Sequence, residues 1–483
     1  MLHNASKTTT TRKGFKVVLS LLLVMSLFGT LMVQAAQVET KTNGIPWYDT
    51  TNNTIDAHGM SFIKVGSYYY VFGTQRENGT GVYDNVFRTI KSYRSTVLKN
   101  WEYVNDALTI NDMPDAASGG TGSRPSVIYN QSTGKYVMYM KRKVNGAKYA
   151  AIATSDTIDG HFTFEKYLTP WGGEAADLSL FQDDDGTAYL VYAENVNANG
   201  HSGRSICIDQ LSSDYLSSVS GSRALEGREA PVMFKANSTY YLLTSGVTGW
   251  NANQMKYATS SSVQSGWSAM QNIGNSVTYE SQPSDILVVN GSATTSYIYV
   301  GDRHDSNYLG DSTYVWLPIQ FSGSSIYLDY YDSFQLDAAT GQWSTGQSSK
   351  TVDSVGGAAN GRMNRDAGTG NVDTVSVTMS GTQVTWKLKS TEHDMYFYLD
   401  NDAGGTSGRL HYDPATGNVD TVSTTKTGNN VKWRLYAAGN GKYYIDNLGA
   451  GSSGRLHYDP VTGNVDLGST GWVGSNVQWT LSP

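Results

Sequence analysis

Five strand-turn-strand units follow one another along the chain, and this repeat limits the fold more than any other feature. Their turns centre near Gly66, Gly134, Gly186, Ser238 and Gly291, and after the first interval they recur about every 52 residues. The units read SFIKVGSYYYVFG, SVIYNQSTGKYVMYM, LSLFQDDDGTAYLVYAEN, PVMFKANSTYYLLTSG and DILVVNGSATTSYIYVG. One unit alone leaves an apolar face exposed, and radial stacking buries it. The pattern predicts an all-β chain in which residues 43–337 form a five-bladed β-propeller.

Composition agrees with an all-β protein of more than one domain. The chain has 483 residues, enough for two or three domains, and 33 of them are tyrosine. Tyr, Thr, Ser and Val together favour strands and turns, and no long stretch repeats apolar residues at helical spacing. The formal net charge of −7 gives no basic signature for nucleic acid.

The N-terminal residues 1–35 have the character of a secretory signal peptide. Basic residues between positions 7 and 16 precede an apolar stretch, and Val33-Gln34-Ala35 suits signal peptidase. An uncleaved membrane anchor is the alternative, because the apolar stretch approaches the length of a span. We expect a secreted, extracellular monomer that no longer contacts the membrane after cleavage. Its single cysteine, Cys207, is interpreted as core filler rather than a nucleophile.

A second repeat occupies the C-terminal part of the chain. GRMNRDAGTGNVD, GRLHYDPATGNVD and GRLHYDPVTGNVD begin at Gly361, Gly408 and Gly454, a period of 46 to 47 residues. The last copy stops before its YYIDN strand, which residues 351–360 can supply. Three repeats closed by the two ends predict a β-trefoil over residues 351–483, after a Gly/Ser/Thr-rich linker of residues 338–350. A three-bladed or solenoid arrangement is the alternative, but three units close a solenoid poorly.

Five residues stand just before the five hairpins: Gly59, Ser123, Asp177, Glu229 and Gln282. The innermost strand of each propeller blade lines the central axis, so these positions are predicted to converge at one end of it. Asp177 and Glu229 would then be neighbouring carboxyl groups, and a nearby negative charge raises a carboxyl pKa. Asp177 could thus keep Glu229 protonated, as a general acid requires. A structural salt bridge, for instance between Glu229 and Arg228, is the alternative.

Such a carboxyl pair indicates glycoside hydrolysis, which uses two carboxyl groups. It also uses aromatic platforms for sugar rings, and Trp171, Trp250 and Trp316 lie in loops between the predicted strands. Each tryptophan by itself is as readily explained by packing.

Residues 45 to about 336 resemble glycoside hydrolase family 43, a family of five-bladed, inverting enzymes. EAPVMFKANSTYYLLTS resembles the family's general-acid strand, which implies Glu229 as the acid. ADLSLFQDDDGTAYLVYAEN resembles the strand that carries the modulator of the acid's pKa, which implies Asp177. DAHGMSFIKVG, LTSGVTGW, YESQPS and GDRHDSNYLGDSTYVWLP resemble the exo-β-1,3-galactanase subfamily.

The chain departs from that family at two axial positions. The family's general-base aspartate aligns with Gly59, although the galactanase subfamily also lacks this aspartate. The subfamily's glutamate ahead of Arg-Pro aligns with Ser123 in GSRPSVIYN. The resemblance implies that Gln282 positions the water. Asp56 and Glu280 are the alternative carboxylates for this role, since Glu280 and Gln282 would share a face of a strand. The substrate contacts that follow from the motifs are His58, Ser123, Arg124, Trp250, Glu280, Arg303 and Trp316. His304 replaces a tryptophan that is common in the subfamily.

In the predicted trefoil, LHYDP places an aromatic ring beside a carboxylate in copies two and three. Tyr412, Asp413, Tyr458 and Asp459 are therefore candidate sugar-binding residues, and holding the turns of the repeat is the alternative role. No cofactor is expected, because no His/Cys cluster has zinc spacing. Asp183 to Gly186 resembles a calcium loop, so a structural calcium ion is an alternative, but a tight turn is the favoured interpretation.

Together these features predict an exo-acting, inverting glycoside hydrolase that acts on galactose-containing polysaccharide of the β-1,3-galactan kind. One alternative is an exo-enzyme that cleaves arabinan or galactofuranose. The other is a carbohydrate-binding protein whose propeller has lost catalysis, which Gly59 and Ser123 favour.

Overall fold

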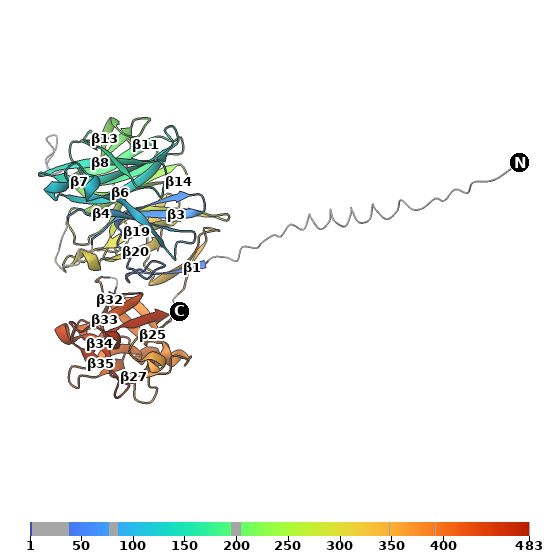
Figure 1. Cartoon of the computed structure of the whole chain (residues 1–483), viewed down its shortest axis with the longest axis vertical. Helices are drawn as coiled ribbons and strands as arrows, with labels where there is room; N and C mark the ends of the chain where they lie inside the picture. The colour runs from blue at the N-terminus through green and yellow to red at the C-terminus, as the bar shows by residue number, and fades with distance from the viewer. Residues whose placement is uncertain (2–37, 77–85, 195–203, 347, 392, 483) are drawn as a thin grey trace. The chain divides into compact units, whose positions relative to one another are not determined.

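The computed structural model describes residue 1 and residues 38–76, 86–194, 204–346, 348–391 and 393–482. Residues 2–35 of the predicted signal peptide lie outside the described residues. The described chain is built from β-strands joined by turns and short 3-10 helices, which agrees with the predicted all-β class (Figure 1). In this described part, no helix has the length and apolar character that crossing a membrane requires.

The five predicted hairpins belong to five separate antiparallel sheets, four with four strands and the last with three. The strands of these sheets are, in chain order, β2 His58–Val65, β3 Tyr68–Thr74, β4 Thr89–Ser95 and β5 Glu102–Thr109; β6 Thr121–Asn130, β7 Lys135–Val144, β8 Ala147–Ser155 and β9 Thr163–Leu168; β10 Ala175–Gln182, β11 Ala188–Glu194, β12 Ser205–Leu211 and β13 Ser218–Glu226; β14 Arg228–Ala236, β15 Thr239–Gly246, β16 Lys256–Ser260 and β17 Gln271–Asn272; β18 Gln282–Asn290, β19 Thr295–Arg303 and β20 Thr313–Pro318.

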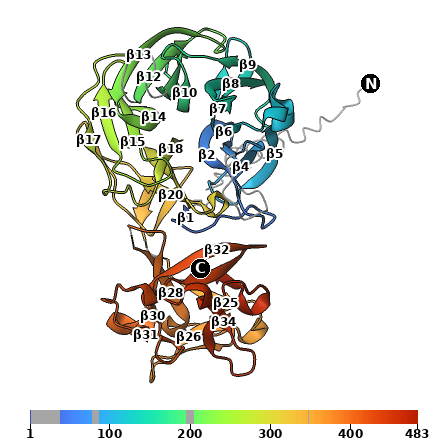
Figure 2. The ribbon, with the colours of Figure 1, turned by 90° about the vertical axis from the view of Figure 1, so that its left-hand side faces the viewer.

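The five sheets form a closed ring. Their first strands, β2, β6, β10, β14 and β18, contact one another in that order, and β18 contacts β2. Figure 2 shows the sheets arranged around one axis. Apolar side chains fill the space between neighbouring sheets; Tyr139 and Ile152, for example, pack with Leu190 and the buried Cys207. This is the five-bladed propeller that the repeat predicts, with Cys207 in a core.

A further sheet joins the two ends of the propeller region. Strand β1, Val38–Thr42, pairs with β23, Ser333–Asp337, and β23 also pairs with β24, Trp343–Thr345. A small hairpin of β21, Gln320–Ser322, and β22, Ser325–Tyr327, precedes it. The segment predicted as a linker, residues 338–350, therefore contains a strand, and Trp343 packs against an apolar core.

The C-terminal region forms a barrel of six strands, which we call the C-terminal barrel. Its strands are β25 Lys350–Ser354, β28 Thr385–Ser390, β29 Phe397–Asn401, β32 Trp433–Gly439, β33 Lys442–Asn447 and β36 Trp479–Ser482. Each pairs with the next, and β36 pairs with β25, so the two ends close the barrel as predicted. Three hairpins extend from it: β26 Arg362–Arg365 with β27 Val372–Val375, β30 Arg409–Tyr412 with β31 Val419–Val422, and β34 Arg455–Tyr458 with β35 Val465–Gly468.

One buried tryptophan per repeat fixes the core of the C-terminal barrel. Trp386, Trp433 and Trp479 are fully buried. Each donates its indole N–H to a backbone carbonyl 23 residues earlier, at distances of 3.0 to 3.2 Å. The three copies of the repeat are therefore structurally equivalent, as their common spacing predicts.

Candidate active site

A bulge near the start of every innermost strand points side chains at the propeller axis. The pairing register shifts between His58 and Ser61 in β2, Ser123 and Ser126 in β6, Ala175 and Leu178 in β10, Glu229 and Val232 in β14, and Pro283 and Asp285 in β18. Such a bulge inserts a residue and re-aims its neighbours. Gly59, Arg124 and Ala230 accordingly adopt left-handed φ values of 58°, 56° and 49°.

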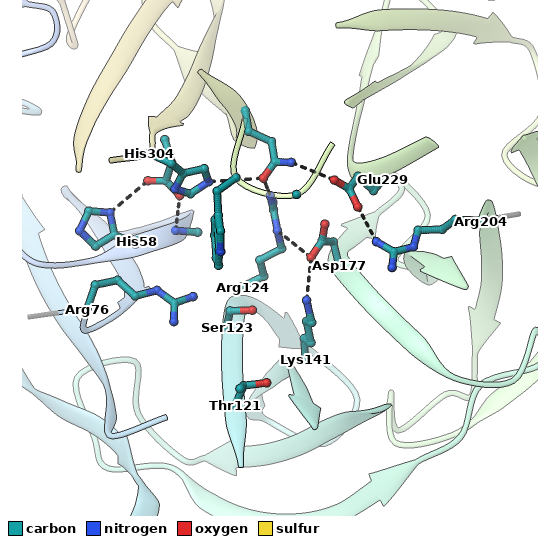
Figure 3. Close-up of a pocket in the computed structure, with 15 residues that line it drawn as sticks. His58, Arg76, Thr121, Ser123, Arg124, Lys141, Asp177, Arg204, Glu229 and His304 are labelled. Carbon is teal, nitrogen blue, oxygen red and sulfur yellow. Dashed lines mark hydrogen bonds and ion pairs between the residues drawn. The ribbon is translucent and has the colours of Figure 1, made fainter. Parts of the chain in front are cut away.

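The five axial positions predicted from the sequence line one pocket of about 150 Å³. Those positions are Gly59, Ser123, Asp177, Glu229 and Gln282. Figure 3 shows the side chains of Ser123, Asp177 and Glu229 pointing into the same space as those of Arg124 and Lys141. The remaining lining residues are His58, Arg76, Thr121, Arg124, Lys141, Arg204, Gly249, Trp250, Asp302 and His304. The convergence on one end of the axis is confirmed.

Glu229 and Asp177 are buried, and their partners differ. Arg204 donates a hydrogen bond to Glu229 Oε2, and Gln282 Nε2 lies 3.4 Å from Glu229 Oε1. Lys141 Nζ donates to Asp177 Oδ1 over 3.1 Å, and Arg124 Nε lies 3.4 Å from the same oxygen.

These environments shift the pKa values of Glu229 and Asp177 in opposite directions. Burial and the charge of Asp177 raise the pKa of Glu229 above its ordinary value, although Arg204 opposes the rise. Burial also raises the pKa of Asp177, but the charges of Lys141 and Arg124 outweigh it and hold that pKa well below its ordinary value. Two neighbouring carboxyl groups whose environments move their pKa values apart can take different roles in catalysis, one as acid and one as carboxylate.

The side-chain amide of Gln282 is oriented by Arg124. Arg124 Nη2 donates to Gln282 Oε1 over 2.8 Å, while Arg124 Nη1 donates to the Pro283 carbonyl over 2.8 Å. His304 Nε2 also lies 3.4 Å from Gln282 Oε1. The amide oxygen is thereby engaged, and the NH2 group of Gln282 faces Glu229.

His58 and Asp302 form a buried polar group on the opposite side of the pocket. The His58 ring nitrogens lie 3.4 Å from Asp56 and 3.4 Å from Asp302. Asp302 Oδ2 accepts hydrogen bonds from Gly59 N over 2.5 Å and from the Ser284 hydroxyl over 3.0 Å. Burial raises the pKa of Asp302, but its ion pair with His58 and the hydrogen bond from Gly59 N outweigh burial and hold the pKa well below the ordinary value. Asp302 is thus an ionised carboxylate at the pocket wall.

Trp250 is the one predicted aromatic contact that lines the pocket in the described residues. Its ring lies edge-on to His304, with centroids 4.8 Å apart, and the Arg76 guanidinium lies 5.7 Å from its centroid. Burial lowers the pKa of His304 to about 4, so this ring is neutral at pH 7.

Two predicted substrate contacts are wrong. Trp316 is 0 % exposed and packs inside an apolar core. Arg303 is also 0 % exposed and donates to the Tyr279 carbonyl over 2.8 Å. Successive strand residues point to opposite faces, so Arg303 faces away from the pocket that Asp302 lines.

Glu280 does not line the axial pocket, although it was predicted to share a strand face with Gln282. Thr278, Tyr279 and Glu280 have left-handed φ values of 48°, 56° and 57°, so a turn precedes β18 there. Burial raises the pKa of Glu280. Trp171 also lies away from the pocket, with the Arg223 guanidinium 5.5 Å from its ring centroid.

In the C-terminal barrel, the predicted sugar-binding residues lie in unequal surroundings. Tyr458 is 9 % exposed and packs in the apolar core, whereas Tyr412 is half-buried. Asp413 accepts hydrogen bonds from Ala415 N and the Thr416 hydroxyl, and Asp459 is bonded in the same way two and three residues further on. The two carboxylates therefore hold their own turns.

The Asp183 to Gly186 segment is likewise held as a tight turn. Gly186 N donates to the Asp183 carbonyl over 3.0 Å, and the Asp183 carboxylate accepts from Lys235 Nζ over 2.7 Å and from the Tyr240 hydroxyl. Within the described ranges, no group of three or more His, Cys, Asp or Glu side chains is arranged to hold a metal ion.

The sequence interpretation missed four charged residues of the pocket: Lys141, Arg204, Asp302 and Arg76. Lys141 and Asp302 lie on second strands, directly opposite Ser123 and Gln282 in the pairing register. Completing each hairpin across its turn would have identified both. Arg204 and Arg76 lie next to segments outside the described residues, where no sequence pattern marks them.

Comparison with known proteins agrees with this geometry. The model of glycosyl hydrolases family 43 matches residues 53–294. An exo-β-1,3-galactanase from Clostridium thermocellum is 32% identical, over 92% of this chain and 99% of that chain, with a TM-score of 0.59. An exo-β-1,3-galactanase from Phanerochaete chrysosporium, solved with β-1,3-galactotriose, is 30% identical over 72% of this chain and 80% of that chain, with a TM-score of 0.59.

A curated xylan 1,3-β-xylosidase from a Vibrio species is 27% identical over 201 residues, and this match spans 35% of that protein. Because the family model matches half of the chain, and the Clostridium galactanase is 32% identical over 92% of it, the chain belongs to glycosyl hydrolases family 43 and is a glycoside hydrolase.

Proposed function

We propose that the protein is an exo-acting, inverting hydrolase of galactose-containing polysaccharide, of the β-1,3-galactan kind. The observation that carries this proposal is the pair of buried carboxyl groups, Glu229 and Asp177, with opposite pKa shifts in one axial pocket. The substrate class is supported by the galactanases among the similar structures, one of them bound to β-1,3-galactotriose.

Glu229 is the proposed general acid. Its raised pKa lets it hold a proton for the leaving glycosidic oxygen to a higher pH than an ordinary glutamate. Asp177 stays ionised between Lys141 and Arg124 and raises the pKa of Glu229 through its charge.

The attacking water must be positioned on the opposite face of the sugar, and Gln282 and Asp302 are the candidates. The Gln282 oxygen already accepts from Arg124. Asp302 is ionised and accepts the Gly59 amide, so a carboxylate from the fifth blade reaches the first-blade position where the family resemblance expects an aspartate. This favours Asp302 as the group that orients or deprotonates the water, with Gln282 as a substrate contact.

A non-catalytic carbohydrate-binding propeller is the second candidate. Glycine at position 59 and serine at position 123 remove two carboxylates that the resemblance predicts, and Arg204 is paired directly with Glu229. The cleavage of arabinan or galactofuranose is the alternative within the enzyme class.

The C-terminal barrel is proposed to be a β-trefoil that binds carbohydrate, because three equivalent hairpins extend from a six-stranded barrel. Secretion, a monomeric state and activity without a cofactor complete the proposal. In the barrel, the half-buried Tyr412 is the better candidate for a sugar contact than the buried Tyr458.

The decisive test is incubation with a panel of β-1,3-galactans, arabinans and galactofuranose-containing chains, with sugar release and anomeric configuration followed by NMR. We expect galactose released as the inverted anomer from β-1,3-galactan. Release from arabinan alone would select the alternative substrate, and binding without release would select the non-catalytic propeller.

A further inference from the structure

We propose that four cations beside the axial pocket bind an anionic substituent of the glycan, a uronic acid carboxylate or a sulfate ester. These are Lys141, Lys143, Lys148 and Arg204, which we call the basic rim. The inference rests on the proposed function for the neutral part of the substrate, and it makes that substrate an acidic galactan chain.

Strand register places the lysines of the basic rim on one face. Ser123 pairs with Lys141 and Thr121 with Lys143, and Lys143 pairs with Lys148 in the next strand. Residues that face each other across strands, or stand two apart along a strand, share a side of the sheet. Thr121, Ser123 and Lys141 line the pocket. Lys143 and Lys148 lie on the same face of the sheet, further from the axis.

The residue between Lys141 and Lys143 in β7 confirms the alternation. Arg142 points to the other side of the sheet, where it is fully buried and its Nη2 lies 2.7 Å from an Asp115 carboxylate oxygen. Its charge is therefore already neutralised and takes no part in the rim.

The pocket holds more positive than negative charge at this side. Three cations, Lys141, Arg124 and Arg204, share two carboxylates, Asp177 and Glu229. Figure 3 shows Lys141 and Arg204 approaching that pair from two sides, with Ser123 and Thr121 contributing only hydroxyl groups.

Lys148 continues the row of cations outward, within electrostatic reach of the Glu174 carboxylate. Burial and the charges of Arg204, Lys141 and Lys143 lower the pKa of its ammonium group, and the charge of Glu174 opposes them. The four cations of the basic rim are thus close enough to repel one another.

Catalysis increases the imbalance. A general acid must carry its proton, and a protonated Glu229 no longer neutralises Arg204. Among the described residues, Arg204 Nε has no hydrogen-bond acceptor, although it is buried. An anionic substituent seated on the basic rim would supply both the missing charge and the missing acceptor. It would also draw Arg204 away from Glu229, which favours the protonated acid.

Binding to matched ligands tests the basic rim without relying on turnover. The probes are a β-1,3-galactotriose carrying one glucuronic acid, its twin with the carboxyl group reduced to an alcohol, and a sulfated galactotriose. For the unmodified protein, we expect the charged ligand to bind at least about tenfold more tightly than the reduced twin, as one charge-assisted contact provides. Tighter binding of the sulfated ligand than of the uronate would identify a sulfate ester as the source of the anion.

Two variants and one control locate the effect. Lys143→Gln with Lys148→Gln should reduce the preference for the charged ligand to less than about threefold, and Lys143→Gln alone, at an exposed position, should reduce it in part. Lys135→Gln removes the same charge at the far end of β7, where Lys135 pairs with Asp156 over 2.8 Å, and should keep the preference. Circular dichroism checks that all variants fold.

The outcomes separate this inference from the proposed function. Equal affinity for the charged ligand and its reduced twin overturns the basic rim, even if both are hydrolysed. A charge preference that survives the double variant also overturns it. Charge-dependent binding with no hydrolysis of either ligand supports the basic rim and contradicts only the proposed enzyme function.

Discussion

Two opposing effects on the pKa of Glu229 determine whether its carboxyl group is protonated. Burial and Asp177 favour its protonated form, whereas its contact with Arg204 favours the carboxylate. The net shift is upward, so the group can donate a proton in a pH range where an ordinary glutamate is ionised.

Replacing Glu229 with glutamine should remove hydrolysis. The amide keeps the shape of the side chain but cannot donate the proton, and the rate on galactan should fall by at least about 10² to 10⁴. An aryl glycoside with a good leaving group should recover part of the rate, because its departure needs less protonation. Glu226→Gln, at an exposed position of β13, is the matched control and should keep full activity. A Glu229→Gln rate within twofold of the unmodified enzyme would remove Glu229 from the mechanism.

Replacing Arg204 with glutamine should change the pH dependence on a neutral substrate. The positive charge of Arg204 stabilises the Glu229 carboxylate, so its removal raises the pKa of Glu229 further. The protonated acid then persists to higher pH, and the basic limb of the kcat/KM profile should move upward. A basic limb that stays in place or moves downward would show that another group sets it.

The sequence predicted the location of individual pocket residues correctly where the hairpin repeat determines their place in the blade. Glu229, Asp177 and Gln282 stand at equivalent places in their blades, so one register places all three. The prediction failed for Arg303 and Trp316, because membership of a motif does not state which face of the strand a side chain takes. Asp302, one residue before Arg303, is the member of that pair that lines the pocket.

At the scale of elements, an arginine–aspartate pair recurs in every repeat of the C-terminal barrel. Asp353 pairs with Arg362, Asp400 with Arg409 and Asp446 with Arg455, each at 2.8 Å. The Arg409 guanidinium also lies 3.7 Å from the centroid of Tyr398. Each pair connects a barrel strand to its hairpin, a role that the sequence period alone did not reveal.

Arg409→Met should destabilise the C-terminal barrel by about 3 kcal/mol, because it leaves the Asp400 carboxylate buried, with only Lys389 at 3.2 Å. The matched control is Arg94→Met, which breaks a pair with Glu102 whose side chains are 33% and 48% exposed. Exposed pairs contribute at most about 1 kcal/mol, so this variant should unfold almost like the unmodified protein. Denaturant unfolding measures both, and equal losses would contradict a special role for the buried pair.

At the scale of the whole molecule, the pocket and the C-terminal barrel come from separate stretches of sequence. All lining residues of the axial pocket lie between His58 and His304. The ring that carries them closes through β18 and β2. The repeat periods predicted both closed structures, whereas strand β24 inside residues 338–350 was missed because a Gly/Ser/Thr-rich composition is also typical of a linker.

A chain that ends at Ser349 keeps β24 and should retain hydrolysis of soluble galacto-oligosaccharides within about twofold. Its activity on long or insoluble galactan should fall by about tenfold or more, since a second binding site raises the effective concentration of the polymer. Tyr412→Ala in the full chain should reproduce part of that loss. Sugar release from both substrate classes, with circular dichroism as the folding control, measures the effect. Equal losses of activity on short and long substrates would show that the C-terminal barrel stabilises the pocket and does not bind the polymer.

The pairing of β25 with β36 has a consequence for the order in which the C-terminal barrel can fold. Thr351 of β25 pairs with Ser482 of β36, so the first strand of the barrel to be synthesised can pair only after the last has been made. No early subset of repeats therefore forms a closed core. Contacts between residues far apart in sequence slow folding, because the loop must close before they stabilise it. The same pairing brings the two chain ends of the barrel together. Joining them by a short peptide and opening the chain at the Gly439–Gly441 turn would keep every strand pair while changing which strand is synthesised last.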